Sequence, residues 1–361
     1  MTINDIIIYI MVIFAVFGAL DRMLGNRFGL GEKFEEGIKA IGVLAISMVG
    51  MISLAPVLAK LLQPVVTPVF QVLGADPAMF VGAILANDMG GAPLAAELAL
   101  DPDAGDFSGL ILGAMLGVTI VFTIPAALGI LEKRDHKFMA TGVLAGVITV
   151  PLGALAGGLT AGYLPGMIFR NLVPIILFAL LIAIGLWKFE RVMIKGFTYF
   201  GKLIVAMITL GLIAGIVEAL TGIVVIPGMA PVKEGFVVVA DIAIVLSGAF
   251  PMMHVLTRVL KKPLMKIGKL LGINETAAAG MVASLANSVP MFGMIKDMDD
   301  RGKVINMAFA TSAAFVFGDH LGFTAGFNPD MMVPMIVGKL VGGVSAVAVA
   351  LFLLKNAEKK V

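Results

Sequence analysis

Long runs of apolar residues, separated by short polar stretches, recur along almost the whole chain. A helix needs about 20 mostly apolar residues to cross the hydrocarbon core of a bilayer. The first run, residues 5–24, is too long for the core of a signal peptide and has no basic segment before it. The pattern therefore predicts an all-α, polytopic membrane protein with about nine spanning helices. The expected spans are residues 5–24, 37–59, 107–131, 138–163, 167–188, 198–220, 237–259, 303–325 and 331–354.

Two further apolar stretches, near residues 75–100 and 273–297, are broken in the middle by Asn, Gly and Pro. Each half has roughly ten residues, which is too few to cross the bilayer as a helix. Irregular backbone at membrane depth is tolerated only where it is buried in protein or lines a cavity. We therefore expect two re-entrant helical hairpins, and a broken full span is the alternative.

The positions of Lys and Arg distinguish these alternatives. If both hairpins return to the side they entered from, and the 22–39 loop lies in the cytoplasm, almost all of the 26 basic residues are cytoplasmic, as the positive-inside rule requires. The exceptions are Lys60, Arg170 and Lys233, which fall outside, and Lys339, which lies within the last span. If the hairpins crossed the membrane instead, this asymmetry would be lost. The charges therefore predict re-entrant hairpins, with the N-terminus outside and the C-terminus in the cytoplasm.

The two hairpins carry related sequences. Residues 85–91 read L-A-N-D-M-G-G, and residues 285–291 read L-A-N-S-V-P-M. The first hairpin would enter from outside and the second from the cytoplasm, so the units around them would form an inverted repeat. We expect a first repeat at 1–163, a connector helix at 164–197 and a second repeat at 198–361; chance similarity between alanine-rich helices is the alternative. Paired broken segments of this kind indicate the midplane binding site of a secondary transporter.

Composition narrows the classes of function. Only 14% of the residues are charged, against about a quarter in an average soluble domain, so no region is left for a separate soluble domain. The chain has no cysteine, which excludes disulfides, iron–sulfur clusters and thiolate metal sites or nucleophiles. We expect the lipid bilayer as its surroundings, with no cofactor, no metal and no nucleic-acid partner, and leave open whether the protein forms a homo-oligomer.

Ionisable residues inside the membrane need a reason, because each costs at least about 2.5 kcal/mol at mid-bilayer. Asp88 lies at the tip of the first hairpin, where it could bind a cation or cap a helix. Asp319 and His320 are adjacent in the 303–325 run, and they could bind a cation, relay protons or form a buried pair that satisfies itself. Lys339 is a candidate counter-ion for either carboxylate.

Neutral residues near these charges complete the candidate binding site. The hairpin tips supply amide and hydroxyl groups. Aromatic rings near Asp319 could offer their faces to an ammonium group, with lipid contact or core packing as the alternative for each ring. These neutral candidates are Asn87, Asn287, Ser288, Phe315, Phe317 and Phe323.

Several longer phrases are distinctive. They include I-N-D-I-I-I-Y-I-M (3–11), L-A-N-D-M-G-G (85–91), G-D-H-L-G-F (318–323) and M-I-V-G-K-L-V-G-G (335–343). These phrases resemble the ethanolamine utilisation permease family, EutH, and the resemblance runs from Met1 to about Ala350. It implies a multi-pass protein of the bacterial inner membrane that brings ethanolamine to the cytosolic ammonia-lyase pathway.

The residues alone predict a transporter or facilitator for a small polar solute, and Asp88 and Asp319 favour a cation. Ethanolamine is a primary ammonium near neutral pH, so the residues and the resemblance indicate the same class of substrate. Two alternatives stay open. One is an ion-coupled carrier of another small polar solute or of a carboxylate, which hairpin N-termini would bind, and the other is an intramembrane enzyme.

Overall fold

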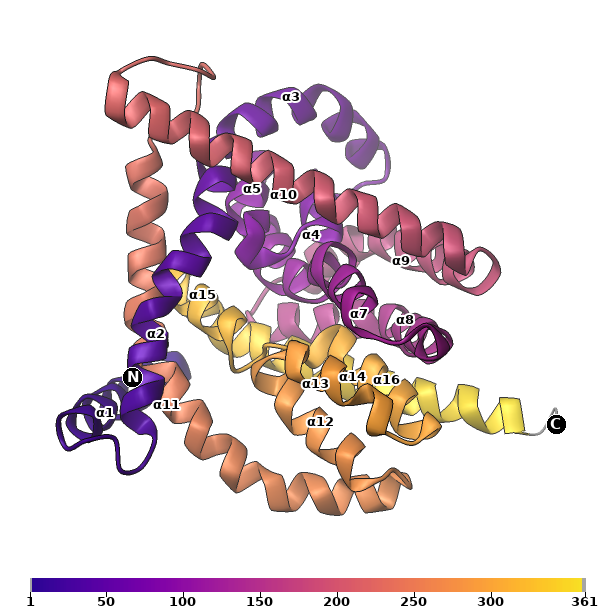
Figure 1. Cartoon of the computed structure of the whole chain (residues 1–361). Helices are drawn as coiled ribbons and strands as arrows, with labels where there is room; N and C mark the ends of the chain where they lie inside the picture. Colours follow the sequence, from indigo (N-terminus) through magenta and orange to yellow (C-terminus); the bar gives the residue numbers. More distant parts are fainter. Residues whose placement is uncertain (1, 359–361) are drawn as a thin grey trace.

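The computed structural model describes residues 2–358, and every regular element in that range is helical (Figure 1). Within this range, eight segments are long and apolar enough to cross a membrane. They match eight of the nine expected spans. The segments are α1 (Ile3–Met23); α2, η1 and α3 (Leu30–Leu44, Ala45–Val49 and Gly50–Val72); α6, η3, η4 and α7 (Pro102–Asp106, Phe107–Gly117, Thr119–Thr123 and Ile124–Ile130); η5 and α8 (Lys133–Asp135 and His136–Thr160); α9 (Pro165–Lys188); α10 (Glu190–Thr221); the first part of α11 (Val232–Leu271); and η7 and α16 (Pro329–Met331 and Met332–Glu358).

The segment from α6 to α7 lies at the centre of the molecule. Of its most apolar window, 83% is buried inside the protein, whereas the corresponding share for α1 is 11%. α8 and α16 pack along each other, and α14 (Asp300–Ala313) lies against both (Figure 1). Large hydrophobic side chains are exposed along α1, α9 and α10. Apolar side chains therefore cover the outer surface of these helices, as contact with lipid requires. The chain is a multi-pass membrane protein.

The first broken stretch is a helical hairpin. It contains α4 (Ala78–Ile84), the short turn η2 (Asn87–Met89) and α5 (Gly91–Leu98). The Asp76 carboxylate accepts a hydrogen bond from the backbone N–H of Ala78 at 2.8 Å, which caps α4. It also accepts from the N–H groups of Leu100 and Asp101, each at 3.0 Å. One side chain therefore ties the start of the stretch to its end.

The second broken stretch is closed in the same manner. It contains α12 (Glu275–Ala286) and α13 (Ser288–Met294). The Asn274 side chain accepts from the N–H of Ala277 at 2.9 Å and donates to the carbonyl of Asp297 at 3.0 Å. Each stretch thus returns to the level at which it began. The re-entrant placement in the membrane, the inverted repeat and the repeat boundaries stay predictions.

The expectation of one continuous helix at 303–325 is wrong. α14 ends at Ala313, α15 (Asp319–Phe327) begins at Asp319, and residues 314–318 between them are not helical. The N–H groups of Phe315 and Phe317 donate to the carbonyls of Ser284 and Leu285, at 2.9 and 3.0 Å. These carbonyls belong to the last turn of α12, where a helix leaves its acceptors without partners. The break in one helix therefore satisfies the end of another.

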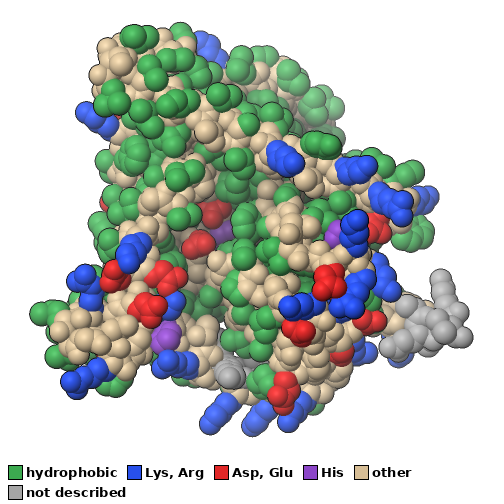
Figure 2. Space-filling model, viewed as in Figure 1, with side chains coloured by type: hydrophobic (Ala, Val, Ile, Leu, Met, Phe, Trp, Pro, Cys, Tyr) green, Lys and Arg blue, Asp and Glu red, His purple; other side chains and the backbone are tan. Residues whose placement is uncertain are grey.

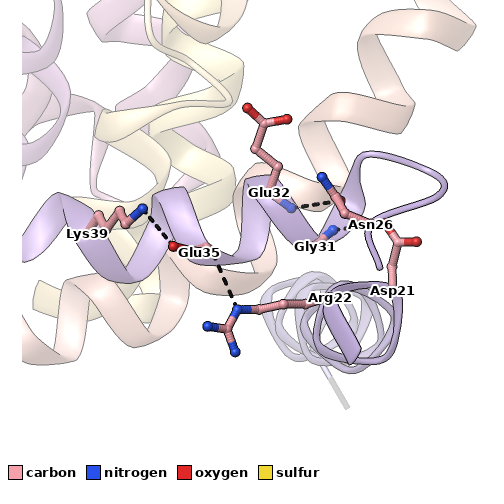
Figure 3. Close-up of polar contacts among 7 residues, drawn as sticks. All are labelled: Asp21, Arg22, Asn26, Gly31, Glu32, Glu35 and Lys39. Carbon is pink, nitrogen blue, oxygen red and sulfur yellow. Dashed lines mark hydrogen bonds and ion pairs between the residues drawn. The ribbon is translucent and has the colours of Figure 1, made fainter. Parts of the chain in front are cut away.

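The turn between α1 and α2 is held by side chains of both helices (Figure 3). Asp21 is 4% exposed, and its carboxylate accepts from the N–H groups of Leu30 and Gly31 at 2.9 and 3.0 Å, at the start of α2. Arg22 on α1 pairs with Glu35 on α2 at 3.3 Å. These contacts fix the first half of α2 relative to α1.

Long-range polar contacts join helix ends that the sequence predicts on the same side of the membrane. The Asn328 amide donates to Asp106 at 2.7 Å, between two predicted outer ends. Lys303 forms a buried ion pair with Asp135 at 2.7 Å, between two predicted cytoplasmic ends. Such contacts agree with the predicted grouping of helix ends, and the orientation of the termini stays a prediction.

We expect the bases of the two hairpins to be exposed on opposite sides of the membrane. Asp103 and Lys296 are exposed residues just beyond the two hairpins, and the chain has no cysteine of its own. An impermeant thiol reagent added to intact cells should label Asp103→Cys, whereas Lys296→Cys should react only in inside-out vesicles. Labelling of both cysteines from one side would contradict the inverted arrangement.

Candidate functional site

A cavity of about 290 Å³, here called the central cavity, lies where irregular backbone from four segments meets. It is partly open, because the lining residues Val43 on α2 and Val205 on α10 are exposed. It is bounded by the end of α2 and the following π-helical segment η1, the tip of the first hairpin, the region of η4 and the break before α15. Such departures from regular helix are frequent at functional sites. The polar and aromatic residues that line the cavity are Ser47, Asp88, Phe122, Phe315, Asp319 and His320.

The first hairpin tip places Asp88 at the cavity. Leu85 and Ala86 are extended, so α4 ends before them. Gly90 has φ +85°, a left-handed conformation that glycine adopts without steric cost, and it starts α5. Asp88 lies in the short turn between these points, and its side chain is 19% exposed. The tip therefore carries a carboxylate that a ligand can reach.

A chain of polar groups leads from Asp88 into the protein. Asp88 Oδ1 lies 3.9 Å from His320 Nε2, and His320 Nδ1 lies 3.0 Å from Lys339 Nζ. Lys339 has no exposed surface, and its ammonium also donates to the carbonyl of Ala114. An ammonium can only donate, so with Lys339 charged Nδ1 accepts and the imidazole proton on Nε2 faces Asp88. His320 thus connects Asp88 to the buried amino group of Lys339.

Asp319 does not form the pair with the adjacent His320 that their positions in the sequence suggested. Its side chain does not pair with His320; within residues 2–358 no hydrogen bond or ion pair of the Asp319 carboxylate is found. The residue is partly exposed and lines the central cavity as well as a second cavity of about 200 Å³. Asp88 and Asp319 therefore face the same space, one with a histidine partner and the other open.

Two aromatic rings form a wall of the central cavity. Phe122 and Phe315 meet edge to face, with centroids 5.7 Å apart, and the Phe315 ring lies 5.2 Å from the imidazole of His320. Phe315 has φ +63°, which is rare for a bulky residue and costs on the order of 1–3 kcal/mol. The backbone bonds at the break hold this strained residue against the cavity.

The remaining sequence candidates lie elsewhere. Phe323 is fully buried and stacks on Phe327 at 5.4 Å, and neither Phe323 nor Phe317 lines the central or the second cavity. Asn287 accepts from the N–H of Val289 at 2.8 Å, so it caps α13, and it lines the second cavity. Their roles in binding stay predictions.

Asn87 and Ser288, at the two hairpin tips, have no exposed surface. The side-chain polar atoms of both residues lack a hydrogen-bond partner among the described residues. Buried polar groups are normally hydrogen-bonded, so these two tips are unusual. The structure does not place either side chain on the wall of the central cavity.

Among the polar and aromatic residues of the cavity wall, sequence reasoning missed two, Ser47 and Phe122. Ser47 is one of only two serines in the expected 37–59 span, and Phe122 precedes a threonine and a proline in V-F-T-I-P. Neither residue is ionisable, so nothing in the sequence distinguishes Ser47 or Phe122 from a residue of ordinary helix packing.

Comparison with known proteins gives one consistent family. The family described as "Ethanolamine utilisation protein, EutH" matches residues 3–353. A Listeria monocytogenes protein named "Probable ethanolamine permease EutH" is 64% identical over 360 residues, covering 100% of this chain and 96% of its own length. An Escherichia coli K12 protein of the same name is 51% identical, covering 99% of this chain and 97% of its own length. "Uncharacterized protein YxeR" of Bacillus subtilis is 53% identical, with coverages of 97% and 95%. No solved structure matches the chain.

The first hairpin packs closely on the segment from α6 to α7, and a change in protein stability can test this packing. A Cβ on Gly117 would collide with the backbone carbonyl of Leu85, just before the hairpin tip. Gly117→Ala should lower the free energy of unfolding by about 1–3 kcal/mol, because backbone must shift to admit the methyl group. Denaturation of the purified protein in detergent measures this.

Gly129→Ala is the matched control, because a Cβ at Gly129 would meet nothing within 4 Å. Its effect should be neutral or stabilising by up to about 1 kcal/mol, through helix propensity alone. Equal stabilities of the two variants would contradict the tight packing of the tip.

Proposed function

The chain belongs to the EutH family of ethanolamine utilisation proteins, and we propose that it carries protonated ethanolamine across the bacterial inner membrane into the cytoplasm. The names of the Listeria and Escherichia relatives support ethanolamine as the substrate, and they describe permeases rather than enzymes. The chemistry of the central cavity supports a small organic cation independently of those names.

The observation that carries the proposal is the pair of carboxylates on the central cavity. Asp88 and Asp319 both line it, beside the rings of Phe122 and Phe315. An ammonium group makes charge-assisted hydrogen bonds to carboxylates and is attracted to the faces of aromatic rings. An ammonium that leaves water needs such partners, because the cost of desolvating an unpaired charge is several kcal/mol. The cavity therefore offers the ammonium end of ethanolamine charged and aromatic partners in place of the water that it leaves.

Ser47 lines the same cavity and offers a partner for the hydroxyl end of the substrate. The Ser47 hydroxyl donates to the carbonyls of Val43 and Leu44, each at 3.1 Å. Its oxygen keeps lone pairs that can accept from the hydroxyl of ethanolamine. Ser47 would thus favour an amino alcohol over a simple alkylamine.

A carboxylate substrate fits this cavity poorly. Two carboxylates on the wall repel an anion, and the nearby Lys339 has no exposed surface with which to bind one. The Lys339 ammonium is also engaged by the Ala114 carbonyl and by His320. The carboxylate carrier is therefore the less favoured of the transport alternatives.

We expect Asp88→Asn to reduce ethanolamine uptake at mildly acidic pH by at least about tenfold, which corresponds to about 1.4 kcal/mol. The amide keeps the shape of the side chain but removes its charge. Uptake of labelled ethanolamine into proteoliposomes is the measurement. Glu97→Gln, an exposed carboxylate in the same hairpin, is the control and should transport normally. Unchanged uptake by Asp88→Asn would contradict a binding role for this carboxylate.

The pH dependence of growth should identify the charged form as the transported one. Neutral ethanolamine is small enough to leak through lipid, so a carrier matters most in acidic medium, where the amine is charged. We expect Asp319→Asn to abolish the growth advantage on ethanolamine at acidic pH and to leave growth at alkaline pH unchanged. An equal loss at both pH values would argue against a protonated-substrate route.

A further inference from the structure

The second cavity, of about 200 Å³, lies between α2, α11 and the tip of the second hairpin. The start of α2 and residues 254–258 of α11 both lie where the sequence predicts the cytoplasmic side of the membrane. Figure 2 shows acidic, basic and histidine side chains gathered over α1, α2 and α11 at the lower left. It also shows acidic side chains and a histidine inside a hollow nearer the centre of this face. The polar residues lining the second cavity are Lys33, Glu36, His254, Thr257, Asn287 and Asp319.

The second cavity and the central cavity share one residue, Asp319. The segment that carries it, from Phe315 to His320, contributes to the walls of both. A ligand bound to the Asp319 carboxylate is therefore within reach of either space. Among the described residues this carboxylate has no hydrogen-bond or ion-pair partner that would have to be displaced first.

The chemistry of the second cavity suits the same kind of ligand as the first. Glu36 binds the ammonium of Lys33, one turn earlier on α2. The ammonium of Lys33 is the same functional group as the ammonium of the proposed substrate, so the wall already binds a group of this kind. His254 adds a buried Nε2 without a hydrogen-bond partner in the described part of the chain, and Asn287 adds an amide. The contacts in Figure 3 hold the α2 turn that positions Glu36.

We propose that the second cavity is a further binding station for a small primary ammonium, on the cytoplasmic side of the central cavity. Asp319 passes the ammonium between the two cavities, and Glu36 receives it by exchanging it for the ammonium of Lys33. Three carboxylates, on Asp88, Asp319 and Glu36, then mark a path in which the charge leaves one partner only when the next is at hand. The inference rests on the proposed function, because it concerns the exit of that substrate.

Cysteine labelling tests this station directly in a chain that has no cysteine. Thr257 lines the second cavity, whereas Thr198 on α10 is a similarly half-buried threonine, predicted on the same side, that lines neither cavity. Each is changed to cysteine in the full-length purified protein in detergent. Labelling rates are measured with aminoethyl methanethiosulfonate, which carries a primary ammonium, and with neutral methyl methanethiosulfonate.

We expect the ammonium reagent to be favoured over the neutral one at Thr257→Cys and not at Thr198→Cys. Ethanolamine should slow labelling at the first position only. When Glu36→Gln is added, the ethanolamine concentration that halves the labelling rate should rise at least about tenfold, as the loss of one charge-assisted contact predicts. Glu275→Gln, an exposed carboxylate of the second hairpin outside this cavity, should leave that concentration unchanged.

If ethanolamine slowed the labelling of Thr257→Cys equally with and without Glu36→Gln, the proposal would be overturned. A cysteine at position 257 that neither reagent labels would overturn it too, because the cavity would not admit a ligand. Uptake into proteoliposomes, measured on the same proteins, keeps the two proposals apart. Absence of uptake by the unaltered protein contradicts the proposed function, whereas normal uptake with protection that ignores Glu36 contradicts this inference alone.

Discussion

The need to satisfy backbone hydrogen bonds away from water is the constraint on which the rest of this structure depends. In lipid, irregular backbone is tolerated only where protein groups supply the missing partners. The bases of both hairpins meet this requirement with a side chain, Asp76 in one and Asn274 in the other. The last carbonyl groups of α12 in the second hairpin also need hydrogen-bond donors, and backbone N–H groups of the break at 314–318 supply them. The break that carries Phe315 and Asp319 to the central cavity is thus stabilised by the end of another helix.

The balance of buried charge follows from the same arrangement. When Asp88, Asp319 and Lys339 are all ionised, the region carries one negative charge more than it carries positive charge. One substrate ammonium neutralises that excess, and a second would not be balanced. Lys339 keeps its place because the Ala114 carbonyl and His320 bind it. A buried charge without such partners is strongly destabilising, so the fully buried Lys339 needs them. Asp319 is partly exposed in the cavity and does not need a protein partner to the same degree.

Much of this fold could be read from the sequence, because apolar run lengths and the positions of Lys and Arg depend on the bilayer rather than on tertiary detail. Asp88, Asp319 and His320 could be found for the same reason, since ionisable groups in a membrane are rare and costly. The break in 303–325 could not, because its residues are apolar and its cause is the end of α12, far away in the chain. Ser47 and Phe122 were missed because packing alone decides which ordinary residues reach the cavity.

The hydrogen bonds that satisfy the second hairpin also connect it mechanically to the binding site. Phe315 and Phe317 are bound to the last turn of α12, and Asp319 begins α15 immediately after them. A displacement of the second hairpin tip therefore moves the segment that separates the two cavities, unless those two backbone bonds break. Breaking them would leave unsatisfied polar groups in a dry interior, at a cost of about 1–3 kcal/mol each. These two bonds therefore favour movement of the hairpin and of the Asp319 segment as one unit over movement of either alone.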